Sequence, residues 1–220
     1  MTMMDIIYLG HSSFKLKGKT GTLITDPFDP KMVGIKFVKT SADIVTLSHS
    51  HSDHNQSNLI SDTRMVIDGP GEYEVVGISI IGIPSFHDDK KGEERGNNII
   101  FVIEMDGLRI VHLGDLGHEL SESVINHVGT VDILMVPVGG FYTVDAEKAA
   151  SVVRSIEPSI VIPMHYLTPG LNPERFGKLQ KVEEFLTATG LPVEKMDKLS
   201  LKKSDISEES KKIVLLEIKN

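Results

Sequence analysis

Six consecutive residues, from His49 to His54, bring three histidines and one carboxylate together in the sequence HSHSDH. Neutral imidazoles and carboxylates are the ligands that zinc and similar divalent ions use where thiolates are absent, and this chain has no cysteine. The segment is internal, so it is not an expression tag. It follows an apolar run, DIVTL, rather than the polar filler of a metal-scavenging tract. The segment therefore predicts a metal site at the end of a strand.

The spacing inside this segment divides its side chains between two ions. Residues two apart face the same side of an extended backbone, so His49 and His51 can bind one ion. Asp53 has the same parity, and the chain must turn near it, so His54 can point toward a second ion. Two ligands for each ion close neither site, and the remaining ligands must come from elsewhere in the chain.

Three other segments place a potential ligand where an apolar strand runs out into a loop. They are IGIPSFH, IVHLGD and IVIPMH, which end at His87, Asp115 and His165. Side chains at such strand ends project into a shared cleft. The aspartate has a further property, because its carboxylate can bridge two cations and a neutral imidazole cannot.

Strands in both halves of the chain, with helices mainly in the second, must position these side chains. We expect strands at 6–9, 13–17, 21–25, 43–47, 64–68, 73–76, 78–83, 98–105, 108–113, 131–136, 160–163 and 212–218, and helices at 118–127, 145–156 and 178–189. The polar residues 202–211 predict a loop. Two mixed sheets packed together and covered by helices give an α/β fold of four layers, αββα. We expect one domain that spans residues 1–220.

The composition argues against several classes of protein. A formal net charge of −8 argues against a broad nucleic-acid footprint and favours a small-molecule substrate. No apolar run approaches the roughly 18 residues that span a bilayer, and the first residues lack the basic start of a signal peptide. We therefore expect a cytoplasmic protein with no membrane partner, and the sequence leaves a homo-oligomer open.

The order of the motifs resembles that of the metallo-β-lactamase fold superfamily over nearly the whole chain. Besides HxHxDH, the segments YLGHSSF, GPGEYEV, GNNIIFVIE, VHLGDLGH and VPVGGFYTVDAEKA are similar to its branch of uncharacterised metal-dependent hydrolases related to the ascorbate-6-phosphate lactonases. The resemblance implies an αββα sandwich with the metals at one edge of the sheets. It also implies two groups of metal ligands that share Asp115: His49, His51 and His87 for the first ion, and Asp53, His54 and His165 for the second.

The chain departs from two other branches of that superfamily. It has no cysteine, which the second-metal site of the β-lactamases themselves commonly involves. It also has His51 where the redox di-iron members are expected to have glutamate. Both departures favour the hydrolase branch.

These features predict a metal-dependent hydrolase with two divalent ions, zinc first and manganese or iron as alternatives. A hydroxide that bridges the ions would attack a small-molecule ester, lactone or phosphoester-type substrate. Asp53 would be catalytic, because it can orient the hydroxide and carry the proton to the leaving group. Two alternatives stay open: a phosphodiesterase or nuclease with the same dinuclear site, and a non-catalytic metal-binding protein that keeps the fold.

Several further polar residues are candidates for contacting substrate or supporting the ligands. His11 and His118 lie in loops beside motifs that resemble those of the family, and either could orient a ligand or touch substrate. Asn97, Asn98 and Tyr142 lie on glycine-punctuated loops that should border the cleft. Turn formation by the asparagines and simple packing by Tyr142 are the alternatives.

Two histidines and one loop have weaker links to the site. His112 lies inside a strand and is expected to be hydrogen-bonded in the core, whereas His127 is expected on the surface at a helix end. The charged segment 88–96, DDKKGEERG, follows His87 directly and could form a lid.

Overall fold

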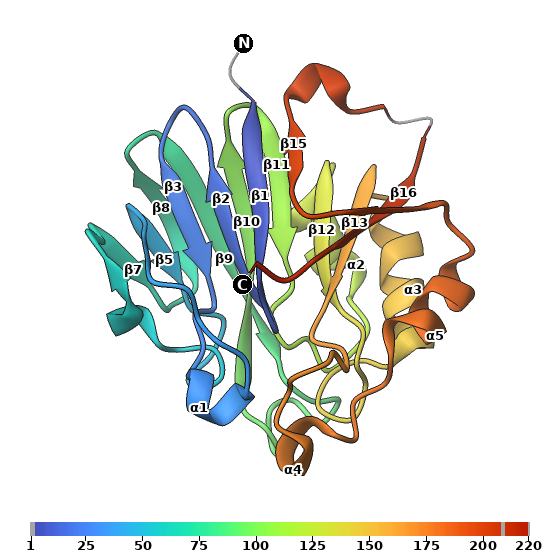
Figure 1. Ribbon diagram of the computed structural model, residues 1–220. Helices are drawn as coiled ribbons and strands as arrows, with labels where there is room; N and C mark the ends of the chain where they lie inside the picture. Colours follow the sequence, from blue (N-terminus) through green and yellow to red (C-terminus); the bar gives the residue numbers. More distant parts are fainter. Residues whose placement is uncertain (1–2, 208–209, 220) are drawn as a thin grey trace.

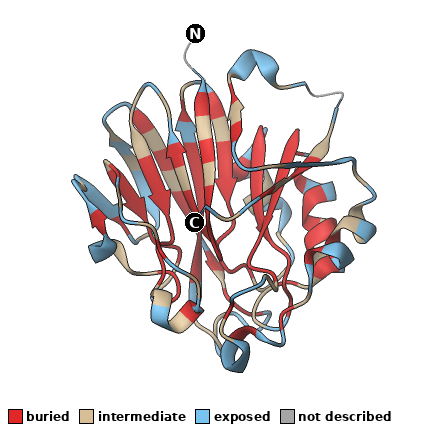
Figure 2. Cartoon of the chain, viewed as in Figure 1, coloured by how far each residue is buried: buried red, intermediate tan, exposed pale blue. Residues whose placement is uncertain are grey.

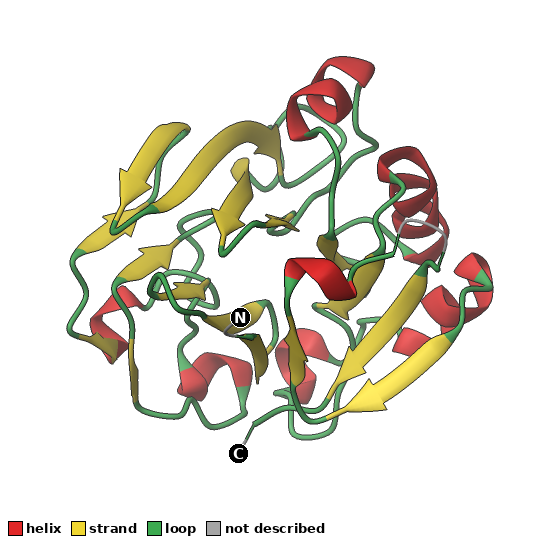
Figure 3. Cartoon of the chain, turned by 90° about the horizontal axis from the view of Figure 1, so that it is seen from above, coloured by secondary structure: helices red, strands yellow, loops and turns green. Residues whose placement is uncertain are grey.

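The computed structural model describes residues 3–207 and 210–219 of the chain. Its strands form two large sheets that pack face to face, and most of the helices lie around the outside of the strands (Figure 1, Figure 3). Among the described residues, no helix is long and apolar enough to cross a membrane.

The first large sheet has six strands in the order β15–β1–β2–β3–β5–β7, and β4 and β6 form a separate pair. β2 pairs antiparallel with both β1 and β3, whereas β3, β5 and β7 are parallel, so the sheet is mixed. The strands of the sheet and of the pair are β1 (Met4–Gly10), β2 (Ser13–Lys17), β3 (Thr22–Thr25), β4 (Thr40–Ser41), β5 (Ile44–Thr46), β6 (Ile60–Ser61), β7 (Met65–Ile67) and β15 (Leu199–Leu201).

The second large sheet has eight strands in the order β14–β16–β13–β12–β11–β10–β9–β8. It is also mixed, because β8 to β11 are antiparallel neighbours and β11, β12, β13, β16 and β14 are parallel. Its strands are β8 (Gly71–Val75), β9 (Ile78–Phe86), β10 (Asn97–Met105), β11 (Leu108–His112), β12 (Ile133–Pro137), β13 (Ile160–Met164), β14 (Val193–Met196) and β16 (Lys212–Leu216).

Helices cover the outer faces of both sheets unequally. α2, α3 and α5 pack their apolar side chains against the eight-stranded sheet. The six-stranded sheet has a thinner cover, made of the single-turn helices α1 and α4 and the loops around them. The order of layers is α, β, β, α, and the predicted fold class is confirmed. The helices and 3₁₀ turns are α1 (Pro30–Val33), η1 (Ser57–Leu59), α2 (Glu122–Val128), α3 (Ala146–Ile156), α4 (Pro173–Phe176), α5 (Val182–Thr189) and η2 (Lys203–Asp205).

Side chains of the two facing sheets fill the centre of the sandwich. Along β1, Ile6 and Tyr8 point into this core, whereas Leu9 packs on the other face. Along β10, Phe101 and Ile103 face the same core, while Ile100 and Val102 face the helices. β10 is therefore covered on both faces, which is why its sequence IIFVI is apolar without alternation. Figure 2 shows the central strands buried along most of their length.

Most of the predicted strands and helices are present, with ends that differ by a few residues. The helix predicted at 118–127 begins later, because Ser121 caps it by accepting a hydrogen bond from Val124 N at 3.4 Å. The sequence does not predict α1, α4, β14 or β15, since elements this short carry no periodic signal. The loop predicted at 202–211 contains η2, and residues 208 and 209 lie outside the described residues.

Candidate metal centre

The predicted ligands and two neighbouring polar residues, His11 and Asp26, follow strands that run in the same direction within each sheet. β1, β3 and β5 of the six-stranded sheet lead to His11, to Asp26 and to the HSHSDH segment. β9, β11 and β13 of the eight-stranded sheet lead to His87, Asp115 and His165. Both sheets bring these strand ends to one edge of the sandwich, the lower edge in Figure 1. Residues far apart in the sequence therefore meet there.

Two main-chain hydrogen bonds join the sheets at this edge. The N–H of His165 donates to the carbonyl of His11 at 2.9 Å, and the N–H of Ile99 donates to the carbonyl of Ser48 at 2.9 Å. His11, Asp26 and His165 have positive φ angles of 56°, 37° and 52°. Such backbone costs about 1–2 kcal/mol in a residue other than glycine. It lets the chain turn sharply at the point where each side chain enters the centre.

Four imidazole nitrogens surround one carboxylate oxygen in the middle of the centre. Oδ2 of Asp115 lies 3.2 Å from Nε2 of both His87 and His165. The same oxygen lies 3.3 Å from Nε2 of His54 and 4.0 Å from Nε2 of His49. All five side chains are at most 3% exposed. The Asp115 carboxylate thus lies between histidines that come from both sheets.

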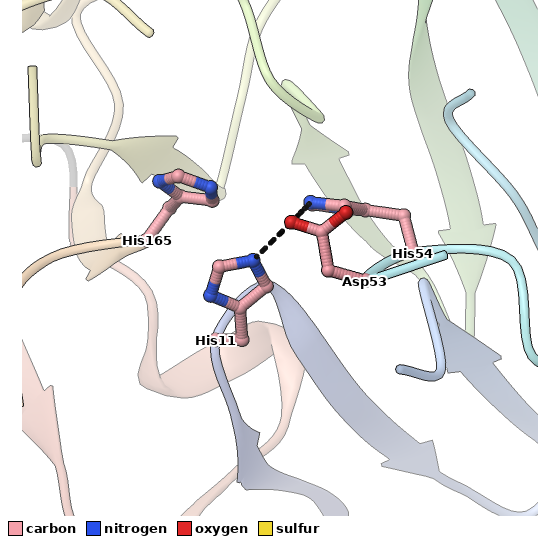
Figure 4. A group of neighbouring side chains, drawn as sticks. All are labelled: His11, Asp53, His54 and His165. Atoms are coloured by element: carbon pink, nitrogen blue, oxygen red, sulfur yellow. Dashed lines mark hydrogen bonds and ion pairs between the residues drawn. The ribbon is translucent and has the colours of Figure 1, made fainter. Parts of the chain in front are cut away.

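Asp53 supplies the second carboxylate of the centre. Its Oδ2 accepts a hydrogen bond from Nε2 of His11 at 3.1 Å and lies 3.7 Å from Nε2 of His54. Figure 4 shows these two rings on either side of the Asp53 oxygen, with the ring of His165 nearby. Potential ligand atoms of the four residues lie within 4.8 Å of one another.

His49, His51 and His87 form a separate group, whose potential ligand atoms likewise lie within 4.8 Å of one another. His51 is exposed, whereas His87 is buried. The group combines two residues that follow β5 with one that follows β9, so it also spans both sheets. The structure therefore brings all seven predicted ligands to one place.

Several polar atoms of the centre are buried and have no hydrogen-bond partner among the described residues. They are Nε2 of His49, His54 and His165 and Oδ1 of Asp115, among others. An unpaired buried polar atom costs about 1–3 kcal/mol, and native folds rarely retain one without a reason. Imidazole nitrogens and carboxylate oxygens that converge in this way are the donors that a divalent cation uses. The residues present fit a metal ion.

Asp26, which the sequence analysis does not assign to the site, fixes two of the histidines. Its fully buried carboxylate accepts hydrogen bonds from Nδ1 of His54 at 3.0 Å and from the N–H and hydroxyl of Ser48 at 2.7 and 2.5 Å. Nδ1 of His49 donates to the same hydroxyl oxygen at 2.9 Å. Both rings then present Nε2 to the centre. The strand-end rule could have found Asp26, since LITDP ends an apolar run with an aspartate.

Asn98 holds the turn that carries Asp115. Its Oδ1 accepts a hydrogen bond from the N–H of Asp115 at 2.9 Å, and its Nδ2 donates to the carbonyl of Leu113 at 2.9 Å. Gly114 lies in this turn with a φ of 57°, and a Cβ there would lie 2.3 Å from Oδ1 of Asn98. Only glycine fits this position. Asn97, by contrast, is exposed at the start of β10 and does not line the cavity described below.

Burial and neighbouring charges shift the pKa values of the centre. Burial works to raise the pKa of Asp115, but His165 and His54 outweigh it and hold that pKa well below its ordinary value. Burial lowers the pKa of His49 well below the ordinary value, and burial together with His165 lowers the pKa of His11 to about 4. Burial also acts to lower the pKa of His54, but the two neighbouring carboxylates raise it well above the ordinary value. These carboxylates therefore favour a cation, either a proton or a metal ion, beside Nε2 of His54.

The other predicted polar residues lie around the centre rather than in it. Nε2 of His118 accepts a hydrogen bond from the N–H of Phe86 at 3.2 Å, which holds the end of β9, and His118 does not line the cavity. His112 is buried in the core and its Nε2 donates to the carbonyl of Ser12 at 2.8 Å. His127 is exposed in the last turn of α2.

A cavity of about 390 Å³ opens onto the centre. Tyr142 and two arginines line it together with five of the predicted ligands: His51, Asp53, His87, Asp115 and His165. Pockets for small ligands have volumes of about 300–1,000 Å³. The cavity therefore has the size expected for a small molecule beside the candidate metal ligands.

Known proteins share this architecture. A family profile described as a beta-lactamase superfamily domain matches residues 5–165. A UPF0173 metal-dependent hydrolase of Thermoplasma acidophilum is 33% identical over 207 residues, which cover 81% of this chain and 92% of that protein. A solved structure from Thermotoga maritima, assigned as a Zn-dependent hydrolase of the metallo-beta-lactamase superfamily, is 36% identical with a TM-score of 0.81, over 98% of this chain and 100% of that one. The metallo hydrolase Igni18 of Ignicoccus hospitalis is 20% identical with a TM-score of 0.71, over 99% of this chain and 97% of that one, and it shows the shared fold.

The family match includes every predicted ligand, from the HSHSDH segment to His165. The resemblance to the superfamily that the motifs carry is therefore confirmed, while the kinship with ascorbate-6-phosphate lactonases stays a prediction. The chain belongs to the UPF0173 metal-dependent hydrolases of the metallo-β-lactamase superfamily.

Proposed function

We propose that the centre holds two divalent ions and hydrolyses an ester, lactone or phosphoester-type bond in a small molecule. The observation that carries this proposal is the position of Asp115. Its Oδ2 lies 3.2 Å from Nε2 of His87, which belongs to one group of ligand atoms, and 3.2 Å from Nε2 of His165, which belongs to the other. A carboxylate in this position can serve two ions at once.

Seven side chains would hold the ions: His49, His51 and His87 in one group, Asp53, His54 and His165 in the other, and Asp115, whose Oδ2 lies close to both groups. Zinc is the first candidate, because imidazole and carboxylate donors suit it. The Thermotoga maritima relative, which is assigned as Zn-dependent, supports the same choice. Manganese and iron are the alternatives.

When bound, such ions supply Lewis acidity, which lowers the pKa of water and polarises the bond to be cleaved. The side chains of the protein would orient the groups and move the proton. Asp53 lines the cavity, and its Oδ2 is occupied by the hydrogen bond from His11. Each carboxylate oxygen can accept more than one partner, so Asp53 can help to hold the second ion and still take up a proton and pass it to the leaving group. His11 keeps the carboxylate oriented during this transfer.

The size of the cavity supports a small substrate. A volume of about 390 Å³ lies toward the lower end of the range of about 300–1,000 Å³ for ligand pockets. A nucleic acid would also need a broad basic surface, and the chain has a net charge of −8. A small-molecule hydrolase is therefore favoured over a nuclease with the same ions.

The metal content of two variants tests whether Asp115 is a ligand of both ions and His165 a ligand of only one. Asp115→Ala should weaken the binding of both ions, because it removes the anion that compensates the repulsion between two dications. His165→Ala should mainly release the second ion. His127→Ala is the surface control and should change neither metal content nor turnover. If metal analysis after dialysis shows that Asp115→Ala retains both ions, the shared assignment is wrong.

Turnover of the metal-loaded protein tests the activity itself. The protein is loaded with zinc or manganese and tested on lactones, thioesters and phosphodiesters. Hydrolysis of at least one of these compounds, if it stops when a chelator removes the metal, supports the proposal. Cleavage of RNA or DNA in the same assay would select the nuclease instead. Metal binding without turnover of any of these compounds would favour a non-catalytic metal-binding protein.

A further inference from the structure

Two arginines line the same cavity as the predicted metal ligands. They are Arg95, from the loop before β10, and Arg175, from α4. The acidic residues of the lining are Asp53 and Asp115, whose carboxylates face histidines of the centre. Outside the predicted ligands, the charged part of the lining is therefore positive, although the whole chain has a net charge of −8.

The loop that carries Arg95 is folded around the side chain of Asp88. Oδ1 of Asp88 accepts hydrogen bonds from the N–H groups of Lys90 and Gly92, both at 2.8 Å. Oδ2 accepts hydrogen bonds from the N–H groups of Glu94 at 3.0 Å and Arg95 at 2.7 Å. Four charge-assisted hydrogen bonds to one carboxylate fix the backbone of this loop. Arg95 is thus held beside the centre by an ordered turn.

The loop after β12 positions the Arg95 side chain. Its guanidinium carbon lies 4.9 Å from the centre of the Tyr142 ring, and its Nη2 donates to the carbonyl of Phe141 at 3.2 Å. The hydroxyl of Tyr142 donates to the carbonyl of Arg175 at 2.8 Å. Tyr142 therefore contacts both of the segments that bring an arginine to the cavity.

The two guanidinium groups keep hydrogen-bond donors available. Neither forms an ion pair with a carboxylate among the described residues, whereas Arg64 and Arg109 each do. A guanidinium has five N–H donors, and Arg95 uses one of them on Phe141. Its planar fork matches the oxygens of a carboxylate or phosphate, which is how proteins commonly bind such groups.

We propose that Arg95 and Arg175 bind an anionic group of the substrate, a carboxylate or phosphate that lies away from the bond being cleaved. This inference rests on the proposed function, because it places that substrate in the same cavity. The substrate class is then a small ester, lactone or phosphoester that carries an oxyanion. The cavity of about 390 Å³ can hold such a molecule with one end at the arginines and the other at the metal centre.

Matched ester substrates test the inference on the metal-loaded enzyme. The p-nitrophenyl ester of butyrate is neutral, the p-nitrophenyl monoester of succinate adds a terminal carboxylate, and the p-nitrophenyl ester of phosphonopropionate adds a phosphonate. Arg95→Gln and Arg175→Gln should each raise KM for the two anionic esters by about tenfold, the effect of losing a charge-assisted hydrogen bond. Their kcat values and their KM for the butyrate ester should stay unchanged. Arg154→Gln, at an exposed position of α3, is the control.

The outcomes distinguish this inference from the proposed function. An equal rise of KM for neutral and anionic esters would show that the arginines only maintain the shape of the cavity, and the inference would fail. If the enzyme hydrolyses none of the esters, calorimetry with succinate and inorganic phosphate decides the question without turnover. Weaker binding of either anion to Arg95→Gln and Arg175→Gln, but not to Arg154→Gln, supports the inference, and equal binding to all four proteins overturns it. The stronger of the two anions indicates whether the natural group is a carboxylate or a phosphate.

Discussion

Replacing Asp26 by asparagine should weaken metal binding without removing any predicted ligand. Oδ1 of Asp26 accepts the N–H of Ser48, a main-chain donor that cannot change, so the amide oxygen of asparagine must take that position. The amide NH₂ then replaces Oδ2, which accepts hydrogen bonds from the Ser48 hydroxyl and from Nδ1 of His54. Two donors would face each other, unless the His54 proton moves from Nδ1 to Nε2. A protonated Nε2 has no lone pair to offer a metal ion.

The size of this effect follows from two estimates that agree. Loss of a buried hydrogen bond to a charged acceptor costs about 1.5–3 kcal/mol, and the Asp26 side chain is 0% exposed. Loss of a carboxylate that orients a metal-binding histidine typically weakens metal binding by about 10–100-fold. That range is about 1.4–2.8 kcal/mol. We therefore expect Asp26→Asn to lose between one and two orders of magnitude in affinity for the ion that His54 would bind.

Competition against a chromophoric chelator measures the affinity, and thermal unfolding of the metal-free protein measures stability. Asp132→Asn is the matched control, because Asp132 is also a buried carboxylate and accepts hydrogen bonds from Arg109 N at 2.9 Å and from the Lys203 ammonium at 2.7 Å. It does not belong to the centre, so Asp132→Asn should lower stability and leave metal affinity within about twofold of the wild type. If Asp26→Asn also stays within about twofold, Asp26 does not control the His54 ring and the reasoning is refuted.

Two other substitutions test backbone and charge effects. In urea unfolding, Gly114→Ala should destabilise the metal-free protein by at least about 2 kcal/mol more than Gly190→Ala. Both glycines have φ near 60°. A Cβ at Gly114 would lie 2.3 Å from a side-chain oxygen, whereas one at Gly190 meets nothing within 4 Å. Comparable losses in the two variants would contradict the predicted clash. Burial works to raise the pKa of Asp5, but the hydrogen bonds from Ser200 and Lys198 outweigh it, and the pKa is lowered. The Asp5 carboxylate therefore stabilises the fold above the unfolded-state pKa of about 3.9, and this stabilisation is lost as pH falls through the folded-state pKa. Asp5→Asn should therefore be less stable than the wild type by about 0.5–1 kcal/mol at pH 7, and a difference that does not shrink between pH 5 and pH 3 would disprove this assignment.

The seven predicted ligands could be identified because each lies at or just after the end of an apolar run. Such a run predicts a strand, and polar side chains at the end of a strand are expected in a loop that borders a site. The LGD segment ending at Asp115 and the PMH segment ending at His165 show the pattern clearly. LITDP has it too, but the sequence shows only that Asp26 follows a strand, and the hydrogen bonds that give it a role depend on Ser48 and His54. The supporting residues of a site are therefore harder to predict than its ligands.

Side-chain direction and loop shape account for the rest. Successive side chains of a strand point to opposite faces, so the pairing of β10 with β9 decides that Asn98 points inward and Asn97 outward, and that pairing cannot be read from the residues alone. Arg95 and Arg175 lie in segments with no periodic pattern. They come to one cavity only because Asp88 folds one loop and Tyr142 contacts both segments. The strand-rich, four-layer fold was predictable, because short apolar runs bounded by turn-forming and charged residues recur along the chain and because the motifs resemble those of the superfamily.

The two main-chain hydrogen bonds that join the sheets at the centre help to fix the shape of the centre through protein contacts rather than through a bound ion. The bonds from His165 to His11 and from Ile99 to Ser48 hold together the strand ends that carry the ligands of the two sheets, and the apolar core between the sheets contains none of these ligands. A small zinc finger differs, because there metal binding and folding are one event. In a cell starved of metal, we expect this protein to stay folded but to be less stable, because the unpaired buried atoms of the centre then keep their cost, and to regain activity when the ion returns.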